Sequence, residues 1–228
     1  MSNQRVHTTA KVWFGGDPEI FLSQDGMIVG SERVLPEEGI GTTPWAAYNS
    51  TPVHMLSANA PISLIRDGIQ VELNIPPTDC REWFNLEIRY AFMKLRDHLQ
   101  QMALDGKKFE ISFRQVVEVD AGELKALSQM SRTLGCAPSF NWYTPEITVE
   151  KRLKAIGFTA DTYPTRSAGG HIHLGLPAHL MSEREKLAPI MDVLLGNTAV
   201  MIDRDPMQAV RRKVYGGAGE FRLPRHGF

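Results

Sequence analysis

The sequence has 228 residues, with 25 Lys plus Arg against 26 Asp plus Glu, which gives a net charge of −1. This near balance excludes the basic field with which proteins hold a nucleic-acid backbone. Hydrophobic residues make up 43% of the chain, enough for a sizeable core, and no apolar run reaches the length of a membrane span. Two cysteines without metal-pair spacing and a polar N-terminus indicate a cytoplasmic protein.

The first predicted elements are strands over residues 12–22 and 27–29, joined by a tight turn at Asp25-Gly26. Pro18 has no backbone donor, so the first strand should lie at a sheet edge or contain an irregularity. One face of this strand carries Asp17, Glu19 and Phe21.

A second hairpin and a long helix follow. Strands over 62–66 and 69–75 flank a turn at Asp67-Gly68, and Pro76-Pro77 is expected to end the second strand. Its core face is predicted to carry Ile69, Val71, Leu73 and Ile75, and its other face Gln70, Glu72 and Asn74. A capping box at Asp79 and Glu82 opens a helix to about Leu104. The apolar stripe of this helix consists of Phe84, Ile88, Ala91, Leu95, Leu99 and Met102.

The second half of the chain is expected to alternate strands with shorter helices. A strand over 109–119 should turn Phe109, Ile111 and Phe113 inward. Helices are predicted over residues 122–130, 148–156 and 182–201, the last with a bend or restart at Pro189.

A strand after Gly169-Gly170 carries two imidazoles. With a period of two residues, His171 and His173 share one side, while the apolar Ile172, Leu174 and Leu176 are expected to face the core. The two glycines allow another backbone or a ligand to approach closely.

Four predicted strands place ionisable side chains on one face, namely Asp17 with Glu19, Glu72, His171 with His173, and Glu220 with Arg222. A solvated sheet face would explain them, but such faces are usually richer in Lys, Ser and Thr than these strands are. Acidic strands brought together would repel each other unless cations lay between them. Carboxylates with an occasional imidazole suit Mg²⁺ or Mn²⁺.

Arginines surround a glycine-rich turn near the end of the sequence. Arg211, Arg212 and Arg222 flank the turn that contains Gly217 and Gly219. Backbone N–H groups in such a turn can hold phosphate, and arginine stabilises charge on a phosphoryl group in transfer. For Arg211 and Arg212 alone, an exposed helix end is the simpler explanation.

Five segments in order resemble the phage amidoligase family called phiEco32-like COOH-NH2 ligase type 2, within the glutamine synthetase and glutamate–cysteine ligase superfamily. The segments are GGDPEIFL, DGIQVELN, GCAPSFN, SAGGHIHLG and RRKVYGGAGEFR, and they span residues 15 to 224. The first is similar to the Glu-Pro-Glu-Phe strand of glutamine synthetase, the fourth to its His-x-His strand, and the last to its phosphate-contacting arginine strand.

The resemblance implies ATP-dependent formation of an amide or peptide bond through an acyl phosphate, with Mg²⁺ (or Mn²⁺). It implies metal binding by Asp17, Glu19, Glu72 and His171, with Glu220 as the weakest candidate. It places His173 near the nucleotide or a phosphate, beside the turn with Gly217 and Gly219. Arg222, with Arg211 or Arg212, would neutralise the transferred phosphoryl group.

The family continues past its arginine strand into a strand with a Glu-x-Arg pair, and this sequence ends at His226-Gly227-Phe228, where that strand is expected to begin. Two alternatives therefore stay open. One is a truncated, non-catalytic descendant that binds a nucleotide or a partner. The other is a metal-dependent hydrolase with Zn²⁺ on the His-x-His strand and Glu19 or Glu72.

The expected fold class is α+β: a glutamine synthetase-like domain over residues 11–228 with a curved, mostly antiparallel sheet, helices on one face and the last family strand absent. Residues 1–10 are expected to be frayed. The expected partners are small-molecule or peptide carboxylates and amines, without nucleic acid or membrane, in the cytoplasm, or in the host cytoplasm if the chain is phage-encoded. The sequence does not specify the substrates or the oligomeric state.

Overall fold

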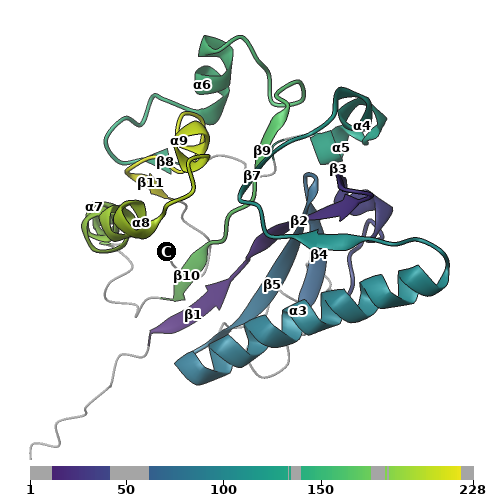
Figure 1. Cartoon of the computed structure of the whole chain (residues 1–228). Helices are drawn as coiled ribbons and strands as arrows, with labels where there is room; N and C mark the ends of the chain where they lie inside the picture. Colours follow the sequence, from purple (N-terminus) through teal and green to yellow (C-terminus); the bar gives the residue numbers. More distant parts are fainter. Residues whose placement is uncertain are drawn as a thin grey trace, which may run out of the picture.

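The computed structural model describes residues 12–41, 62–132, 134, 140–175, 183 and 185–221. It is a mixed α+β structure built on a curled antiparallel sheet that forms a half-barrel (Figure 1). This confirms the α+β class and the antiparallel sheet. Residues 1–10, which were predicted to be frayed, and Leu176, Ser182 and Arg222 lie outside the described residues.

Within the described residues, seven strands make up the main sheet. Its path runs from β10 (Ile172–Gly175) through β1 (Trp13–Gly16), β5 (Gln70–Thr78) and β2 (Glu19–Gln24) to β3 (Met27–Val29). β4 (Ser63–Asp67) pairs with β5, and β6 (Glu110–Ser112) pairs with β2. The pairings are antiparallel. The early strand β1 and the late strand β10 therefore lie side by side at one edge of the sheet.

Helix α3 (Arg81–Leu104) covers one face of this sheet (Figure 1). The predicted stripe is confirmed, because Ala91, Leu95 and Leu99 are buried and the rest of it packs around the same core. The predicted capping box is wrong: Cys80 is the N-cap residue and makes no side-chain cap bond. Asp105 and Gly106 end the helix as expected, with Gly106 at a φ of 79°.

A second, smaller core lies on the other side of β2. Phe21 is fully buried there with Ile69, Val117 and Val119. Ile20 and Leu22 belong instead to the core under α3. The face that begins with Asp17 and Glu19 therefore becomes apolar at Phe21, and the polar part of the sheet is confined to one end.

An upper layer stands on the side of the sheet opposite α3 (Figure 1). It contains the two-stranded sheets β7 (Val116–Glu118) with β9 (Thr165–Ser167) and β8 (Phe140–Asn141) with β11 (Glu220–Phe221). Its helices are α4 (Ala121–Ala126), α5 (Gln129–Arg132), α6 (Val149–Ala155), α7 (Leu187–Met191), α8 (Asn197–Ile202) and α9 (Gln208–Arg211), with a π-helix η3 (Asp192–Gly196) between α7 and α8. A 3-10 turn, η1 (Ser31–Arg33), follows β3.

The turns confirm one prediction and correct another. Asp25 and Gly26 both have positive φ and close the hairpin between β2 and β3, as expected. In the second hairpin Asp67 pairs with Gln70, so the turn is Gly68-Ile69 and Asp67 belongs to β4. Ile69 consequently enters the smaller core and not the face that it was predicted to share.

Two prolines sit inside a strand that was predicted to stop before them. β5 continues through Pro76-Pro77 to Thr78, which pairs with Phe14. The register of β5 against β1 shifts between this pair and the pair of Ile75 with Gly16. A bulge tolerates residues without a ladder donor, which explains how the strand accommodates both prolines. The irregularity predicted near Pro18 is confirmed, because that residue separates β1 from β2.

Two further predictions were wrong. The strand over 109–119 is divided into β6 and β7, and Phe113 between them is 72% exposed. Ile172 is 65% exposed, so the apolar side of the His-x-His strand does not enter a core at that position. From Leu187 on, the helix predicted over residues 182–201 is confirmed as α7, η3 and α8, which end at Ile202. Pro189 lies in the first turn of α7, where a missing donor is tolerated. Among the described residues, no helix is both long enough and apolar enough to cross a bilayer.

Candidate metal centre

The pairing of β1 with β10 brings Asp17 close to the His-x-His strand. β1 pairs with β10 so that Gly15 lies opposite His173, and this register leads Asp17 to His171, whose carbonyl accepts from the Asp17 N–H. The approach is close: a Cβ on Gly170 would lie 3.3 Å from Cα of Pro18. The glycines before the His-x-His strand therefore do what the sequence predicted, which is to admit another backbone.

Asp17 joins the two imidazoles in a first cluster. Its Oδ1 accepts from Nδ1 of His171 at 2.9 Å and from the His171 backbone N–H at 2.7 Å, and its Oδ2 accepts from Nε2 of His173 at 3.0 Å. Burial on its own would raise the pKa of Asp17, but the hydrogen bonds from both imidazoles hold it well below its usual range. Each of the three residues offers a ligand atom within 4.8 Å of the others.

A second cluster consists of three carboxylates. Glu19 and Glu72 are direct cross-strand partners on β2 and β5, and Asp67 joins them from the end of β4, again with ligand atoms within 4.8 Å of one another. Like charges in this position destabilise a sheet. Burial, and then the neighbouring Asp67, raise the pKa of Glu19 to about 7, although the Gly169 N–H donates to its carboxylate at 2.9 Å. A bound cation would relieve this repulsion.

The guanidinium group of Arg211 lies next to the second cluster. A Cβ on Gly216 would collide with its Nη1, and one on Gly169 would lie 3.0 Å from its Nη2, so two glycines make room for the group. The Tyr215 ring lies 5.1 Å from its Cζ, and the Tyr215 hydroxyl lies 3.2 Å from Nε2 of His171. The buried Nε of Arg211 has no hydrogen-bond partner within the described part of the chain.

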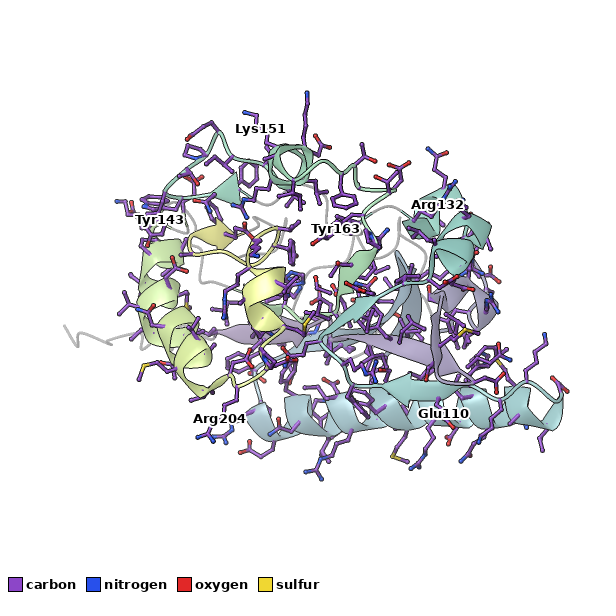
Figure 2. The ribbon with its side chains drawn as sticks, turned by 45° about the horizontal axis from the view of Figure 1, so that its top comes forward. Glu110, Arg132, Tyr143, Lys151, Tyr163 and Arg204 are labelled. Atoms are coloured by element: carbon purple, nitrogen blue, oxygen red, sulfur yellow. The ribbon has the colours of Figure 1, made fainter. Side chains whose placement is uncertain are left out.

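Two clefts meet at Glu19 and Arg211. One, of about 580 Å³, has a mostly apolar wall that includes Val116, Val149 and Tyr163. Tyr163 enters it from the segment between α6 and β9 (Figure 2). The other, of about 680 Å³, is more polar and is lined by a second arginine, Arg114. The arrangement gives two ligands separate approaches to one acidic and one basic group.

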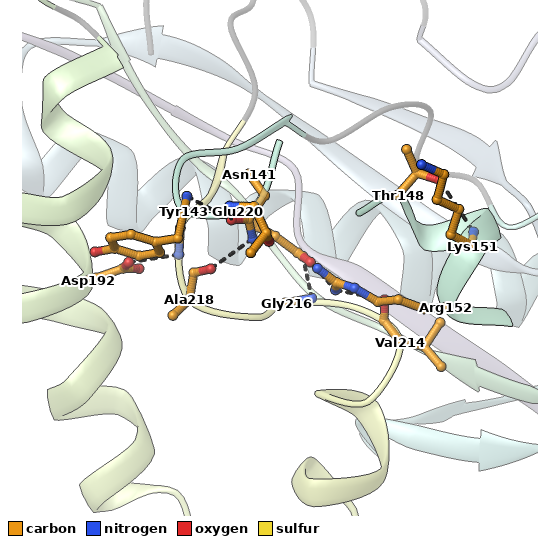
Figure 3. Close-up of polar contacts among 12 residues, drawn as sticks. Asn141, Tyr143, Thr148, Lys151, Arg152, Asp192, Val214, Gly216, Ala218 and Glu220 are labelled. Atoms are coloured by element: carbon orange, nitrogen blue, oxygen red, sulfur yellow. Dashed lines mark hydrogen bonds and ion pairs between the residues drawn. The ribbon is translucent and has the colours of Figure 1, made fainter. Parts of the chain in front are cut away.

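Glu220 does not join the other predicted ligands. Its strand β11 pairs with β8 in a separate two-stranded sheet, so the prediction that four strands share one polar face is wrong for this one. The carboxylate of Glu220 forms an ion pair with Arg152 and accepts from the Gly216 N–H at 2.7 Å (Figure 3). It belongs to neither cluster of candidate ligands.

The glycine-rich turn is already occupied by the chain's own carboxylates. The Gly216 N–H donates to Glu220, and the Gly219 N–H donates to Oδ2 of Asp192 at 2.7 Å, while the phosphate role of Gly219 stays a prediction. The phosphate role of Gly217 stays a prediction. Arg212 is half-buried and lines neither of the two clefts, unlike Arg211.

Sequence reasoning missed two residues of the site. Asp67 was interpreted as part of a turn, although a hairpin register shifted by one residue would have placed it beside Glu72. Tyr215 lies in the quoted YGG motif, but nothing in the motif indicates a contact with His171. The five residues that the structure does bring together are Asp17, Glu19, Glu72, His171 and His173.

Comparison of the chain with family models, with curated proteins and with solved structures gave no match. The geometry of the site therefore carries the functional assignment.

Proposed function

We propose that this chain is an ATP-dependent carboxylate–amine ligase that acts with Mg²⁺ (or Mn²⁺). The observation that carries the proposal is the pair of adjacent candidate ligand clusters beside the guanidinium group of Arg211, whose Nε is buried without a hydrogen-bond partner in the described part of the chain. The oxygen-rich set of Glu19, Asp67 and Glu72 suits these hard cations, and the burial that raises the pKa of Glu19, together with the nearby Asp67, fits a site built for positive charge. When bound, the ions would neutralise the triphosphate and stabilise charge on the transferred phosphoryl group.

The reaction needs two substrates at one point, and the two clefts supply two approaches to it. An acceptor carboxylate attacks the γ-phosphorus of ATP, which forms an acyl phosphate and releases ADP. A neutral amine then attacks the acyl carbon, the C–O bond to phosphate breaks, and the amine loses a proton. In this scheme Arg211 stabilises negative charge on the phosphoryl oxygens at the junction of the clefts.

In the same scheme Asp17, His171 and His173 form one ion site, and Glu19, Asp67 and Glu72 form the other. The Tyr215 hydroxyl orients His171 from the side away from Asp17. Arg222 keeps its proposed phosphate contact, although it lies outside the described residues.

The test is phosphate release from ATP with Mg²⁺ and pooled amino acids and amines, together with the melting temperature. Mg²⁺ and ATP should raise the melting temperature, because a ligand that binds only the folded state stabilises it. Arg211→Gln should lower the rate of phosphate release about 100-fold or more. Arg212→Gln is the matched control, because its side chain lines neither cleft, and we expect an unchanged rate.

The outcomes separate three interpretations. If millimolar Mg²⁺ and ATP leave the melting temperature unchanged, the ligase proposal is contradicted. A shift without phosphate release in any mixture would support the non-catalytic descendant.

A metal-dependent hydrolase is the second candidate, because two imidazoles and one carboxylate, as in Asp17, His171 and His173, form a common catalytic zinc set. Tightly held Zn²⁺ in the purified protein, together with indifference to ATP, would favour the hydrolase.

A further inference from the structure

The outer face of α3 carries an apolar seam. Trp83, Leu86, Tyr90 and Met93 are 54%, 54%, 59% and 48% exposed. Their spacings of three, four and three residues place them in one row along the helix, as the a and d positions of a coiled coil are placed.

None of the four residues of this row belongs to the core that holds α3 against the sheet in the described part of the chain. The opposite side of α3 already anchors the helix through Ala91, Leu95 and Leu99. Figure 1 shows the sheet on one side of α3 and no described element on the other, and Figure 2 shows side chains of α3 standing on that free side. Trp, Tyr and Met are enriched at protein interfaces, whereas a solvent-facing helix surface is usually polar.

Charged residues beside the seam indicate which occupant fits. Beside the seam, Glu82 and Glu87 lie in the first two turns of the helix, and the basic residues Arg89, Lys94 and Arg96 follow. Two charges depart from this pattern: Arg81 lies on the side of the helix away from the seam, and Asp97 continues the row four residues after Met93. A second copy packed in parallel would place acid on acid and base on base. A second copy packed antiparallel would place the acidic part of one helix against the basic part of the other.

We propose that the outer face of α3 is the contact surface of a homodimer in which two copies of α3 pack antiparallel across a two-fold axis. With Leu86 facing Tyr90 of the second copy, Trp83 faces Met93 of that copy, and the row is self-complementary, as a two-fold interface requires. The same register brings Glu82 beside Arg96 of the second copy. Within one chain these two residues are about 21 Å apart along the helix axis and do not pair.

The first experiment measures the mass of the whole chain by sedimentation equilibrium over a micromolar to millimolar concentration series. A seam of four residues is short, so we expect a monomer–dimer equilibrium in the micromolar range. Replacing both Trp83 and Tyr90 by Ala should weaken association at least about tenfold, because aromatic residues dominate such contacts. Met27→Ala with Met130→Ala is the control, since both methionines are exposed on other elements. A chain that stays monomeric throughout overturns the proposal, as does a dimer that tolerates loss of both aromatic residues.

The second experiment tests orientation by charge reversal. Glu82→Arg alone or Arg96→Glu alone should each weaken the dimer about tenfold, because each places like charges together in both halves of the interface. The double variant Glu82→Arg/Arg96→Glu should restore wild-type association. Both side chains are exposed, and circular dichroism should show that each variant stays folded. Failure of the double variant to restore association would overturn the antiparallel arrangement.

Discussion

Glu19 is a carboxyl group that the fold buries beside two other carboxyl groups. Only 8% of the residue is exposed, and its direct cross-strand partner is Glu72. Its nearest compensating contact is the Gly169 N–H. Without a bound cation the folded chain therefore retains a proton on Glu19 at a pH where an ordinary glutamate has lost it.

This property predicts a specific dependence of stability on pH in the presence of a chelator. The pKa of Glu19 rises from an ordinary 4.5 to about 7 in the folded chain, so between these values the folded state binds more protons than the unfolded state. The contribution of Glu19 to stability therefore falls as pH rises through this window. By pH 8, Glu19→Gln should be more stable than the wild type by on the order of 2–3 kcal/mol, an advantage that disappears at pH 4.

Denaturant unfolding from pH 4 to pH 8 measures this difference. Glu118→Gln on β7 is the control, because that side chain is exposed and lies in neither cluster of candidate ligands. If Glu19→Gln and the wild type show parallel pH profiles, the burial of an acidic cluster is refuted.

At the scale of elements, the turn after α9 holds the catalytic candidate in place. Arg211 ends the helix, and the backbone returns past its guanidinium group at Gly216, where φ is 74°. Glu220 and Asp192 bind two amides of the turn from different elements. These contacts fix the turn against Arg211.

Gly216→Ala should displace Arg211, whereas Gly26→Ala should not disturb any side chain. Both glycines have positive φ, so each substitution carries a backbone penalty of roughly 1–2 kcal/mol. A Cβ on Gly216 would also collide with Nη1 of Arg211, while a Cβ on Gly26 meets no atom within 4 Å. Thermal unfolding should show a larger loss for Gly216→Ala, and the rate of phosphate release should fall only in that variant. Equal effects of both substitutions would contradict the role of the turn.

At the scale of the whole molecule, the cluster of Asp17, His171 and His173 connects the edge strand β10 to the rest of the main sheet. Among the described residues, β10 pairs only with β1, so its backbone bonds are expected to open readily. His171 and His173 link this segment to Asp17 on the connection between β1 and β2. A metal ion shared by the three side chains would add a restraint that the backbone lacks.

Hydrogen exchange should therefore slow in β10 when Mg²⁺ or Mn²⁺ is added. If opening of β10 releases the ion, a concentration 100-fold above the dissociation constant slows exchange about 100-fold. The β7–β9 pair carries none of the candidate ligands and serves as the internal control. Unchanged exchange in β10 at saturating metal would refute a shared ion at Asp17, His171 and His173.

Periodicity predicted that Glu19, Glu72 and His171 share a face because β1, β2, β5 and β10 are antiparallel neighbours, but it missed Asp67 and wrongly added Glu220. The alternation of side chains along each strand determines the face on which Glu19, Glu72 and His171 lie, and pairing of the strands places these side chains on the same face of the sheet. What could not be predicted depends on contacts distant in sequence. The placement of β11 in its own sheet, and the exposure of Ile172 and Phe113, follow from which elements cover each strand.

The 154 residues between Asp17 and His171 impose an order on assembly. During synthesis the carboxylates of β2, β4 and β5 emerge about a hundred residues before the imidazoles, a delay on the order of 5–20 s at ordinary elongation rates. For that interval the nascent half-barrel holds acids without their histidine neighbours. Under the proposed function a divalent ion supplies the missing counter-charge, and the early hairpins would bind it before the chain is finished.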